Sequence, residues 1–409
     1  MKLLLALLLA LPAAPGDNDV WNWRGPNRDG HSPDKGLLKQ WPPSGPALLW
    51  TADGLGAGYA TVAVAGDRLY TAGDFDGMGH LLCLSAADGK VLWKTPVGKP
   101  YENPGKPDWC GFRSTPTTDG KIVVALGAQG DLVCCDAATG KEIWRKDLRS
   151  DFGGRVGGWL YSESPLIDGE QIVCIAGGGQ GAVVALKKST GERIWQSKGL
   201  KDRAEYTSLV ASELGGARQY VVLTQESVAG ISARDGQVLW QAARKGATAV
   251  IPTPVVKDDF VYVTSGYGIG HNGFKVTAQG GSFKAEEIYN GKEMANHHGG
   301  VVLVGDHVYG SDDRQRLKCV ELKTGKLVWE DKAVSKGSVT FADGHLYTLA
   351  ERKGVVVLAE ATPEGYKEKG RFSLPQLSGR PTWAHPVVFG GRLYLRDDAK
   401  LFCYDVKAK

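Results

Sequence analysis

Short apolar stretches separated by turns run along almost the whole chain. In "VAVAGDRLYTAG" (residues 62–73) and "PVVFGGRLYLRD" (residues 386–397), hydrophobic residues flank a turn and alternate with polar or small residues. This period of two is typical of β-strands, whereas an amphipathic helix would repeat every 3.6 residues. The 56 glycines fit a chain with many tight turns. The pattern therefore predicts an all-β protein built from short antiparallel strands.

One six-residue motif recurs through the chain. It reads "DGKVLW" at residues 88–93, and its relatives "TGKEIW", "TGERIW", "DGQVLW" and "TGKLVW" end at Trp144, Trp195, Trp240 and Trp329. In every copy the tryptophan follows a glycine by four residues, which indicates a hairpin turn followed by a strand. Successive copies lie about 50 residues apart, and the longer gap before Trp329 holds a degenerate copy, "FKVTAQGGSFKAEEIY". The chain is therefore built from repeats.

Each repeat holds four short strands. Four-stranded units of ~40–50 residues arranged around an axis are typical of a β-propeller. The last unit, ending in "LFCYDVKAK", lacks a fourth strand, while "PALLWTAD" at residues 46–53 is a strand without a unit. We therefore expect the N-terminal strand to complete the last blade and close the ring. The repeats predict an eight-bladed β-propeller over residues 46–409, after an N-terminal extension of residues 17–45.

The repeated tryptophans have an architectural interpretation. An indole on the outer strand of a blade can pack on the neighbouring blade and donate its N–H group to a nearby acceptor. We assign this structural docking role to Trp50, Trp93, Trp144, Trp195, Trp240 and Trp329. The repetition thus predicts the fold and assigns no chemistry.

The first residues carry the pattern of an export signal. Lys2 is followed by an apolar run and then by small residues, with a predicted cleavage after Gly16. An uncleaved membrane anchor is the alternative, but the apolar run is shorter than the ~20 residues that span a bilayer. We expect residues 1–16 to be a signal peptide and the protein to be periplasmic or secreted, not an integral membrane protein.

The net charge, the cysteine content and the missing motifs exclude several classes of function. The net charge is +4 without a basic block, so no nucleic-acid partner is expected. The 7 cysteines have neither the paired spacing of a zinc site nor a Cys-x-x-Cys-His haem motif. Motifs for a serine nucleophile, a zinc protease or a phosphate loop are also missing. We assign no catalytic and no metal-binding residues, and we expect a monomer with protein partners in the periplasm or cell envelope.

The repeat units resemble a known family of propellers. Their "A-x-[DT]-G-x-x-x-W" pattern is similar to the tryptophan-docking repeats of the pyrroloquinoline quinone (PQQ)-like β-propeller superfamily, which includes quinoprotein alcohol dehydrogenases and the outer-membrane assembly factor BamB. The stretches "WNWRGPNRDGHS", "NHHGGVVL", "RPTWAHPVV" and "SGYG" resemble more narrowly the secreted BamB-like propeller proteins of planctomycetes. The resemblance covers about residues 20–406 and is specific for the fold, because propellers host enzymes, binders and scaffolds alike.

The resemblance implies two functions of different classes. In the dehydrogenases the cofactor lies in the central channel with a calcium ion, and some of these enzymes carry a disulfide between adjacent cysteines. Cys134 and Cys135 are adjacent, but their distance from the turn glycine matches core strand positions in the other repeats. The lipid-anchoring cysteine of BamB has no counterpart, because no cysteine precedes Cys83.

The favoured interpretation is an exported, BamB-like propeller that is a non-catalytic scaffold or binding protein and presents protein- or ligand-binding faces. This interpretation does not favour an enzyme, and it predicts no cofactor. The alternative is a PQQ-dependent enzyme resembling the quinoprotein alcohol dehydrogenases, with PQQ and calcium as cofactors. Sugar or polysaccharide binding, suggested by exposed aromatic residues, is a third alternative.

Residues just before the innermost strand of each blade would line one rim of the central channel. These positions hold Tyr59, Arg113, Glu163, His297, His298, Lys336, Trp383 and His385. Such side chains can simply cap the strand starts, or they can form a binding site. We take Arg113, Glu163, His297, His298, Trp383 and His385 as a candidate rim site for a ligand or partner. Adjacent residues on an extended strand point to opposite faces, so only one of His297 and His298 is expected to face the channel, which argues against a three-histidine metal site.

Overall fold

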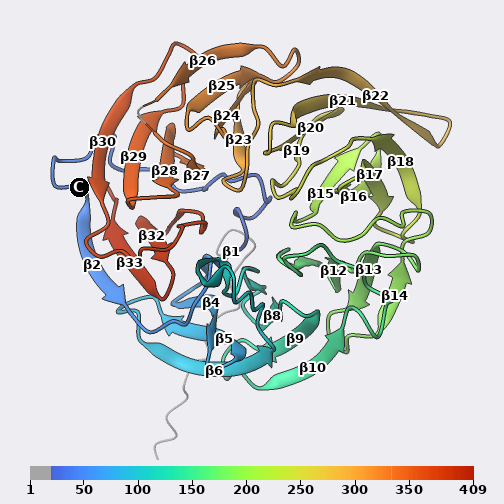
Figure 1. Cartoon of the computed structure of the whole chain (residues 1–409), viewed down its shortest axis with the longest axis horizontal. Coiled ribbons are helices and arrows are strands. Elements are labelled where there is room, and N and C mark those ends of the chain that lie inside the picture. Colours follow the sequence, from blue (N-terminus) through green and yellow to red (C-terminus); the bar gives the residue numbers. More distant parts are fainter. Residues whose placement is uncertain (1–19, 333) are drawn as a thin grey trace, which may run out of the picture.

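The computed structural model describes residues 20–332 and 334–409, and the predicted signal peptide lies outside them. Eight antiparallel sheets surround a central axis like the blades of a wheel (Figure 1). The prediction of an all-β, eight-bladed propeller is therefore confirmed. Within the described ranges, no helix has the length and apolar character needed to cross a membrane.

Seven blades follow one another in chain order, each with its first strand innermost. Their strands are β3–β6 (Ala63–Ala65, Arg68–Phe75, Met78–Ser85, Val91–Gly98), β7–β10 (Thr117–Thr118, Ile122–Leu126, Asp131–Asp136, Glu142–Asp147), β11–β14 (Leu166–Asp168, Gln171–Ile175, Val183–Lys187, Arg193–Gln196), β15–β18 (Val210–Leu214, Ala217–Leu223, Ser227–Ser232, Val238–Ala243), β19–β22 (Val255–Lys257, Phe260–Ser265, Gly270–Gln279, Ser282–Gly291), β23–β26 (Val301–Val304, His307–Ser311, Leu317–Glu321, Leu327–Asp331) and β27–β30 (Gly337–Ala342, His345–Ala350, Val355–Glu360, Glu368–Ser373).

The eighth blade joins the two ends of the chain. Its inner strands are β31–β33 (Val387–Phe389, Arg392–Asp397 and Lys400–Asp405), and its outer strand is β2 (Ala47–Ala52). The pairing of β2 with β33 is antiparallel, with Ala47 opposite Asp405 and Trp50 opposite Cys403. The expected closure of the ring by the N-terminal strand is therefore confirmed.

The repeated tryptophans lie between blades. A Cβ built on Gly191, whose φ is +70°, would lie 2.8 Å from the Trp144 ring of the preceding blade. The indole nitrogen of Trp144 donates to the carbonyl oxygen of Lys188 at 2.9 Å. Only a glycine lets the turn take this φ and the ring rest on its backbone. The same packing joins Trp50 to Gly89, Trp93 to Gly140 and Trp195 to Gly236, while Tyr289 takes the place of tryptophan against Gly325.

Two docking tryptophans differ from Trp144 in their hydrogen bonding. The indole nitrogen of Trp240 donates at 2.6 Å to the side-chain oxygen of Gln219 within its own blade. The indole nitrogen of Trp93 is buried and has no hydrogen-bond partner among the described residues. Packing of the ring on the next blade is therefore more general than the hydrogen bond.

Residues 20–32, which we call the N-terminal plug, lie in the central channel. The 17–45 extension is expected from the sequence only to precede the ring, but β1 (Val20–Trp21) pairs with β3 at the inner edge of the first blade. Figure 1 shows this segment at the centre of the ring. Arg24 and Arg28 are both buried, and the guanidinium of Arg28 donates to the backbone carbonyl oxygens of Leu209, at 3.0 Å, and Pro165.

The plug contacts every blade. Beyond the β1–β3 pair, the contacts join Asn22 to Thr118, Arg28 to Pro165 and Leu209, Trp23 to Thr253, Arg24 to Val301 and His385, and His31 to Phe341. These partners lie in or just before the innermost strands. One short segment therefore cross-links the centre of the whole ring.

Candidate functional site

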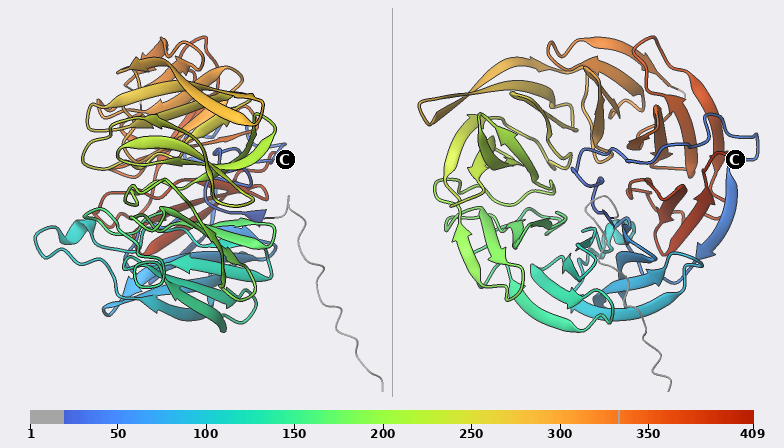
Figure 2. Two further views of the ribbon diagram at one scale, coloured as in Figure 1. Left: turned by 90° about the vertical axis from the view of Figure 1, so that its right-hand side faces the viewer. Right: turned by 180° about the vertical axis from the view of Figure 1, so that it is seen from behind.

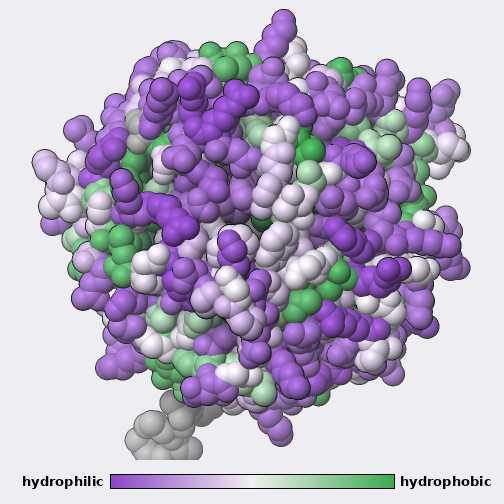
Figure 3. Space-filling view, in the orientation of Figure 1, coloured by the Kyte–Doolittle hydropathy of each residue, from purple (hydrophilic) through white to green (hydrophobic). Residues whose placement is uncertain are grey.

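A pocket of about 440 Å³ opens at one mouth of the channel, with Trp23 of the plug in its wall. The loop that holds the short 3-10 helix η2 (Pro107–Trp109) projects from this face, and the C-terminus lies on the opposite side (Figure 2). Hydrophilic residues cover most of the pocket face (Figure 3). The wall contains the aromatic residues Trp23, Tyr59, Trp109, Trp159, Tyr206, Tyr267 and Trp383, and the polar residues Arg113, Ser162, His297, His298, Lys336, Glu351 and Arg352.

The aromatic residues form two groups in the wall. The rings of Tyr59 and Trp383 lie 4.4 Å apart between centroids and are inclined by 36°. Trp159 packs edge-on against Tyr206 at 5.7 Å and lies 6.4 Å from Trp109. Each ring holds its neighbour in place, so the pocket presents flat apolar surfaces of fixed orientation.

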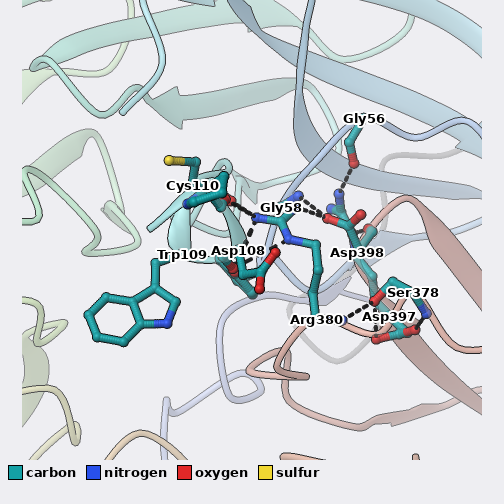
Figure 4. A network of polar contacts seen from close by, with 12 residues as sticks. Gly56, Gly58, Asp108, Trp109, Cys110, Ser378, Arg380, Asp397 and Asp398 are labelled. Carbon is teal, nitrogen blue, oxygen red and sulfur yellow. Dashed lines mark hydrogen bonds and ion pairs between the residues drawn. The ribbon is translucent and has the colours of Figure 1, made fainter. Parts of the chain in front are cut away.

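Arg380 holds the projecting loop against the ring. Its guanidinium pairs with Asp398 and donates to the backbone carbonyl oxygens of Cys110 and of Asp108, the latter at 3.2 Å (Figure 4). The Trp109 indole points away from this network. Because Arg380 precedes the last blade and the loop follows the first, this contact fixes Trp109 beside the pocket across the ring closure.

Charged side chains occupy the other part of the wall. Lys336 Nζ lies 2.9 Å from Glu351 Oε2 and 3.3 Å from His297 Nδ1. The indole nitrogen of Trp383 donates to Glu351 Oε1 at 2.8 Å. His297 also faces Asp313, at 3.3 Å. Glu351 therefore orients both a cation and an aromatic ring toward the same space.

Two polar groups in the wall lack partners. Both ring nitrogens of His298 and the hydroxyl oxygen of Ser162 are buried without a hydrogen bond to any described residue. Burial and the neighbouring His297 and Lys336 lower the pKa of His298 well below its ordinary value, so this imidazole is neutral. Unsatisfied buried polar atoms are rare in native proteins and indicate a missing water or ligand.

The structure brings together four residues of the predicted rim site. Arg113, His297, His298 and Trp383 line the pocket, as do Tyr59 and Lys336 from the wider set of rim positions. Both histidines face it, contrary to the expectation for an extended strand, because the chain bends at His298 before β23 begins.

The other two predicted residues lie beneath the pocket, next to the plug. His385 is buried, with Nδ1 3.4 Å from the Arg24 guanidinium and Nε2 3.0 Å from the His298 carbonyl oxygen. Desolvation and Arg24 lower the pKa of His385 to about 3. Glu163 accepts a hydrogen bond from the Ile175 amide at 2.8 Å, and burial raises its pKa to about 8. Both side chains therefore lie beside the plug and not on the open face.

The sequence reasoning missed most of the aromatic wall. Trp23, Trp109 and Trp159 stand outside the glycine-tryptophan repeat, and this departure was a signal that they do not serve blade docking. Tyr206, Tyr267 and Glu351 had no comparable signal, because they lie in loops without a shared register.

The residues present do not fit a calcium-bound quinone cofactor. Within the described ranges, no group of three or more His, Cys, Asp or Glu side chains is placed to hold a metal ion. The pocket wall offers one carboxylate, that of Glu351, which is already paired. Cys134 and Cys135 are free thiols on opposite faces of β9, each in a different hydrophobic cluster. They serve as small core residues.

Comparisons with known proteins agree on one family. The sequence model described as "Outer membrane protein assembly factor BamB" matches residues 35–109 and 100–331. A curated protein of that name from Nitrosomonas eutropha is 26% identical over 308 residues, which are 69% of this chain and 66% of the relative. The matches span less than two thirds of the length of the first curated relatives.

Solved structures show the same fold. BamB from Moraxella catarrhalis has a TM-score of 0.62 at 16% identity and covers 86% of this chain and 95% of its own. A quinohemoprotein alcohol dehydrogenase from Comamonas testosteroni has a TM-score of 0.64 at 12% identity and covers 97% of this chain and 82% of its own. At such identities the likeness concerns the fold alone, whereas the family match covers more than half of the sequence. The chain therefore belongs to the family of the outer membrane protein assembly factor BamB.

Proposed function

We propose that this protein is an exported, non-catalytic scaffold that takes part in the assembly of outer-membrane proteins. The observation that carries the proposal is the match of the BamB family model to residues 35–109 and 100–331. The closed ring and the plug that cross-links it support the same role, because a rigid disc can present the loops on its two faces to protein partners.

The proposed location is the periplasm or the outside of the cell, with partners in the cell envelope. The export pattern of residues 1–16 supports this location.

Deletion of the gene in the native host tests this role. We expect the amounts of outer-membrane β-barrel proteins to fall and to recover when the intact gene is restored. The control is a gene that lacks the codons for residues 17–52. It should not restore the outer-membrane proteins, because its product lacks the closing strand β2 and the plug. Unchanged outer-membrane proteins in the deletion strain would contradict the proposal.

The proposed absence of a cofactor is tested separately. The paired carboxylate of Glu351 and the divided positions of Cys134 and Cys135 support it. The mature protein is incubated with PQQ, calcium, an alcohol and an electron-accepting dye. Robust turnover that depends on PQQ would overturn the scaffold role in favour of a quinoprotein dehydrogenase.

A further inference from the structure

The aromatic side chains of the pocket wall can stack on a ligand ring that has an apolar face. Trp383, packed on Tyr59, provides one such surface, and the neighbouring rings of Trp109 and Trp159 provide others. Trp109, Trp159 and Trp383 are half-buried and line the pocket, so they offer ring surface to a ligand, whereas Tyr59 is buried and supports Trp383 from behind. The volume of about 440 Å³ lies in the usual range of small-molecule sites.

The unpartnered polar groups of the wall can form hydrogen bonds with a ligand hydroxyl. His298 is 7% exposed, and neither of its nitrogens has a partner among the described residues. A neutral imidazole offers one donor and one acceptor, and the Ser162 hydroxyl also offers both. A ligand hydroxyl, which donates and accepts, satisfies either group. Both residues line the pocket.

The charge of the wall favours an anion. Arg113, Lys336 and Arg352 face the pocket against the single carboxylate of Glu351. A cationic ligand is disfavoured, because the face of Tyr59 is already approached by Arg380, at 5.3 Å from the ring centroid, and by Arg113, at 5.9 Å. Arg352 is exposed at the rim, where its guanidinium can form two parallel hydrogen bonds to a carboxylate.

From these three observations we propose that the pocket binds an acidic sugar residue of a glycan. The C–H face of the sugar ring lies on Trp383, which Tyr59 supports, its hydroxyls meet His298 and Ser162, and its carboxylate meets Arg352 and Lys336. This proposal goes beyond the scaffold role and does not depend on it, because the site is complete within one chain.

Isothermal titration calorimetry with the mature protein tests the proposal. The acidic probes are tri-galacturonate and a hyaluronan tetrasaccharide, and the matched neutral probe is cellotetraose. The fourth probe is 2-naphthoate, which has a flat ring and a carboxylate but no sugar hydroxyls. We expect at least one acidic oligosaccharide to bind at least ~10-fold more tightly than cellotetraose, with an affinity that falls as salt is raised.

Three variants assign the binding to this pocket. Trp383→Ala should weaken the acidic probe about 10-fold through loss of stacking. Arg352→Ala should weaken the acidic probe and reduce its salt dependence without harming the fold, because the residue is exposed. The control is Arg193→Ala on the outer strand β14, which is exposed and far from the lining residues, and it should bind like the wild type.

The other outcomes overturn the proposal. Equal affinity for cellotetraose would remove the role of the carboxylate, and binding of 2-naphthoate alone would make the site one for aromatic acids. Absence of binding by both acidic probes, or binding that is unchanged in Trp383→Ala and Arg352→Ala proteins with wild-type circular dichroism, would refute an acidic-sugar site here.

Discussion

Replacing Gly191 with alanine tests how neighbouring blades hold one another. A Cβ at this position would lie 2.8 Å from two carbons of the Trp144 ring, and the glycine has a φ of +70°. Gly169 of the same blade is a matched control, because its φ is +59° and a Cβ there would meet nothing within 4 Å. Both alanines enter the left-handed region, and only Gly191→Ala presses on the indole.

The control measures the backbone cost alone, which is about 1–2 kcal/mol for an L-residue in this conformation. At Gly191 the Trp144 ring must also move. Overpacking of this kind costs about 1–3 kcal/mol, and the 2.9 Å bond from the indole to Lys188 contributes about 1 kcal/mol. We therefore expect Gly191→Ala to lower the free energy of unfolding by about 2 kcal/mol more than Gly169→Ala.

Urea unfolding followed by near-ultraviolet circular dichroism measures this difference, because the signal reports the packing of tryptophan. The Gly191→Ala protein should also lose part of that signal before unfolding, while the Gly169→Ala protein should keep it. If the two variants differ by less than about 0.5 kcal/mol, the indole does not rest on the turn glycine in solution, and the docking role is refuted.

Three further predictions concern the closure, the buried acid and the thiols. Deleting residues 17–52 removes β1, the plug and β2, so the protein should aggregate in size-exclusion chromatography and melt at a lower temperature; equal behaviour to the mature chain would contradict the closure. Because burial raises the pKa of Glu163 from 4.5 to about 8, with Arg28 and Cys174 beside it, the folded state holds the proton more tightly and the free energy of unfolding should fall as pH rises between these values. Glu163→Gln should flatten this slope in urea titrations, and parallel slopes would refute the raised pKa. Among the 7 cysteines only Cys110 is not buried, so a thiol reagent should label one site rapidly and none in Cys110→Ser; rapid labelling of a second site would contradict the buried core.

The eight blades could be predicted because the sequence repeats the same pattern in successive units. The glycine-to-tryptophan spacing marks the outer hairpin of each blade, and the orphan strand with Trp50 marks the closure. The plug could not be predicted, because Arg24 and Arg28 bind backbone carbonyl oxygens, which leave no trace in the sequence of their partners.

The pocket was predictable only as far as the repeat register reaches. Positions before the inner strands gave Arg113 and Trp383, but in the third blade Ser162 lines the pocket and the adjacent Glu163 is buried below it. A shift of one residue exchanges the two faces of an extended chain, and the sequence does not reveal such a shift in a loop. Trp109 is placed by Arg380, a contact across the ring that no local pattern shows.

The pairing of β2 with β33 means that the first strand of the ring to be synthesised is the last to find its place in a sheet. Ala47 is synthesised long before Asp405, its partner in the sheet. Seven blades can form hairpin by hairpin, but β2 has no sheet to join until β31–β33 are made. Closing so long a loop costs only a little more entropy than closing a short one, so the delay is one of timing more than of energy. Until β2 and β33 meet, each is an unpaired strand edge of the kind that promotes aggregation, so the last step of closure also protects the first strand of the ring.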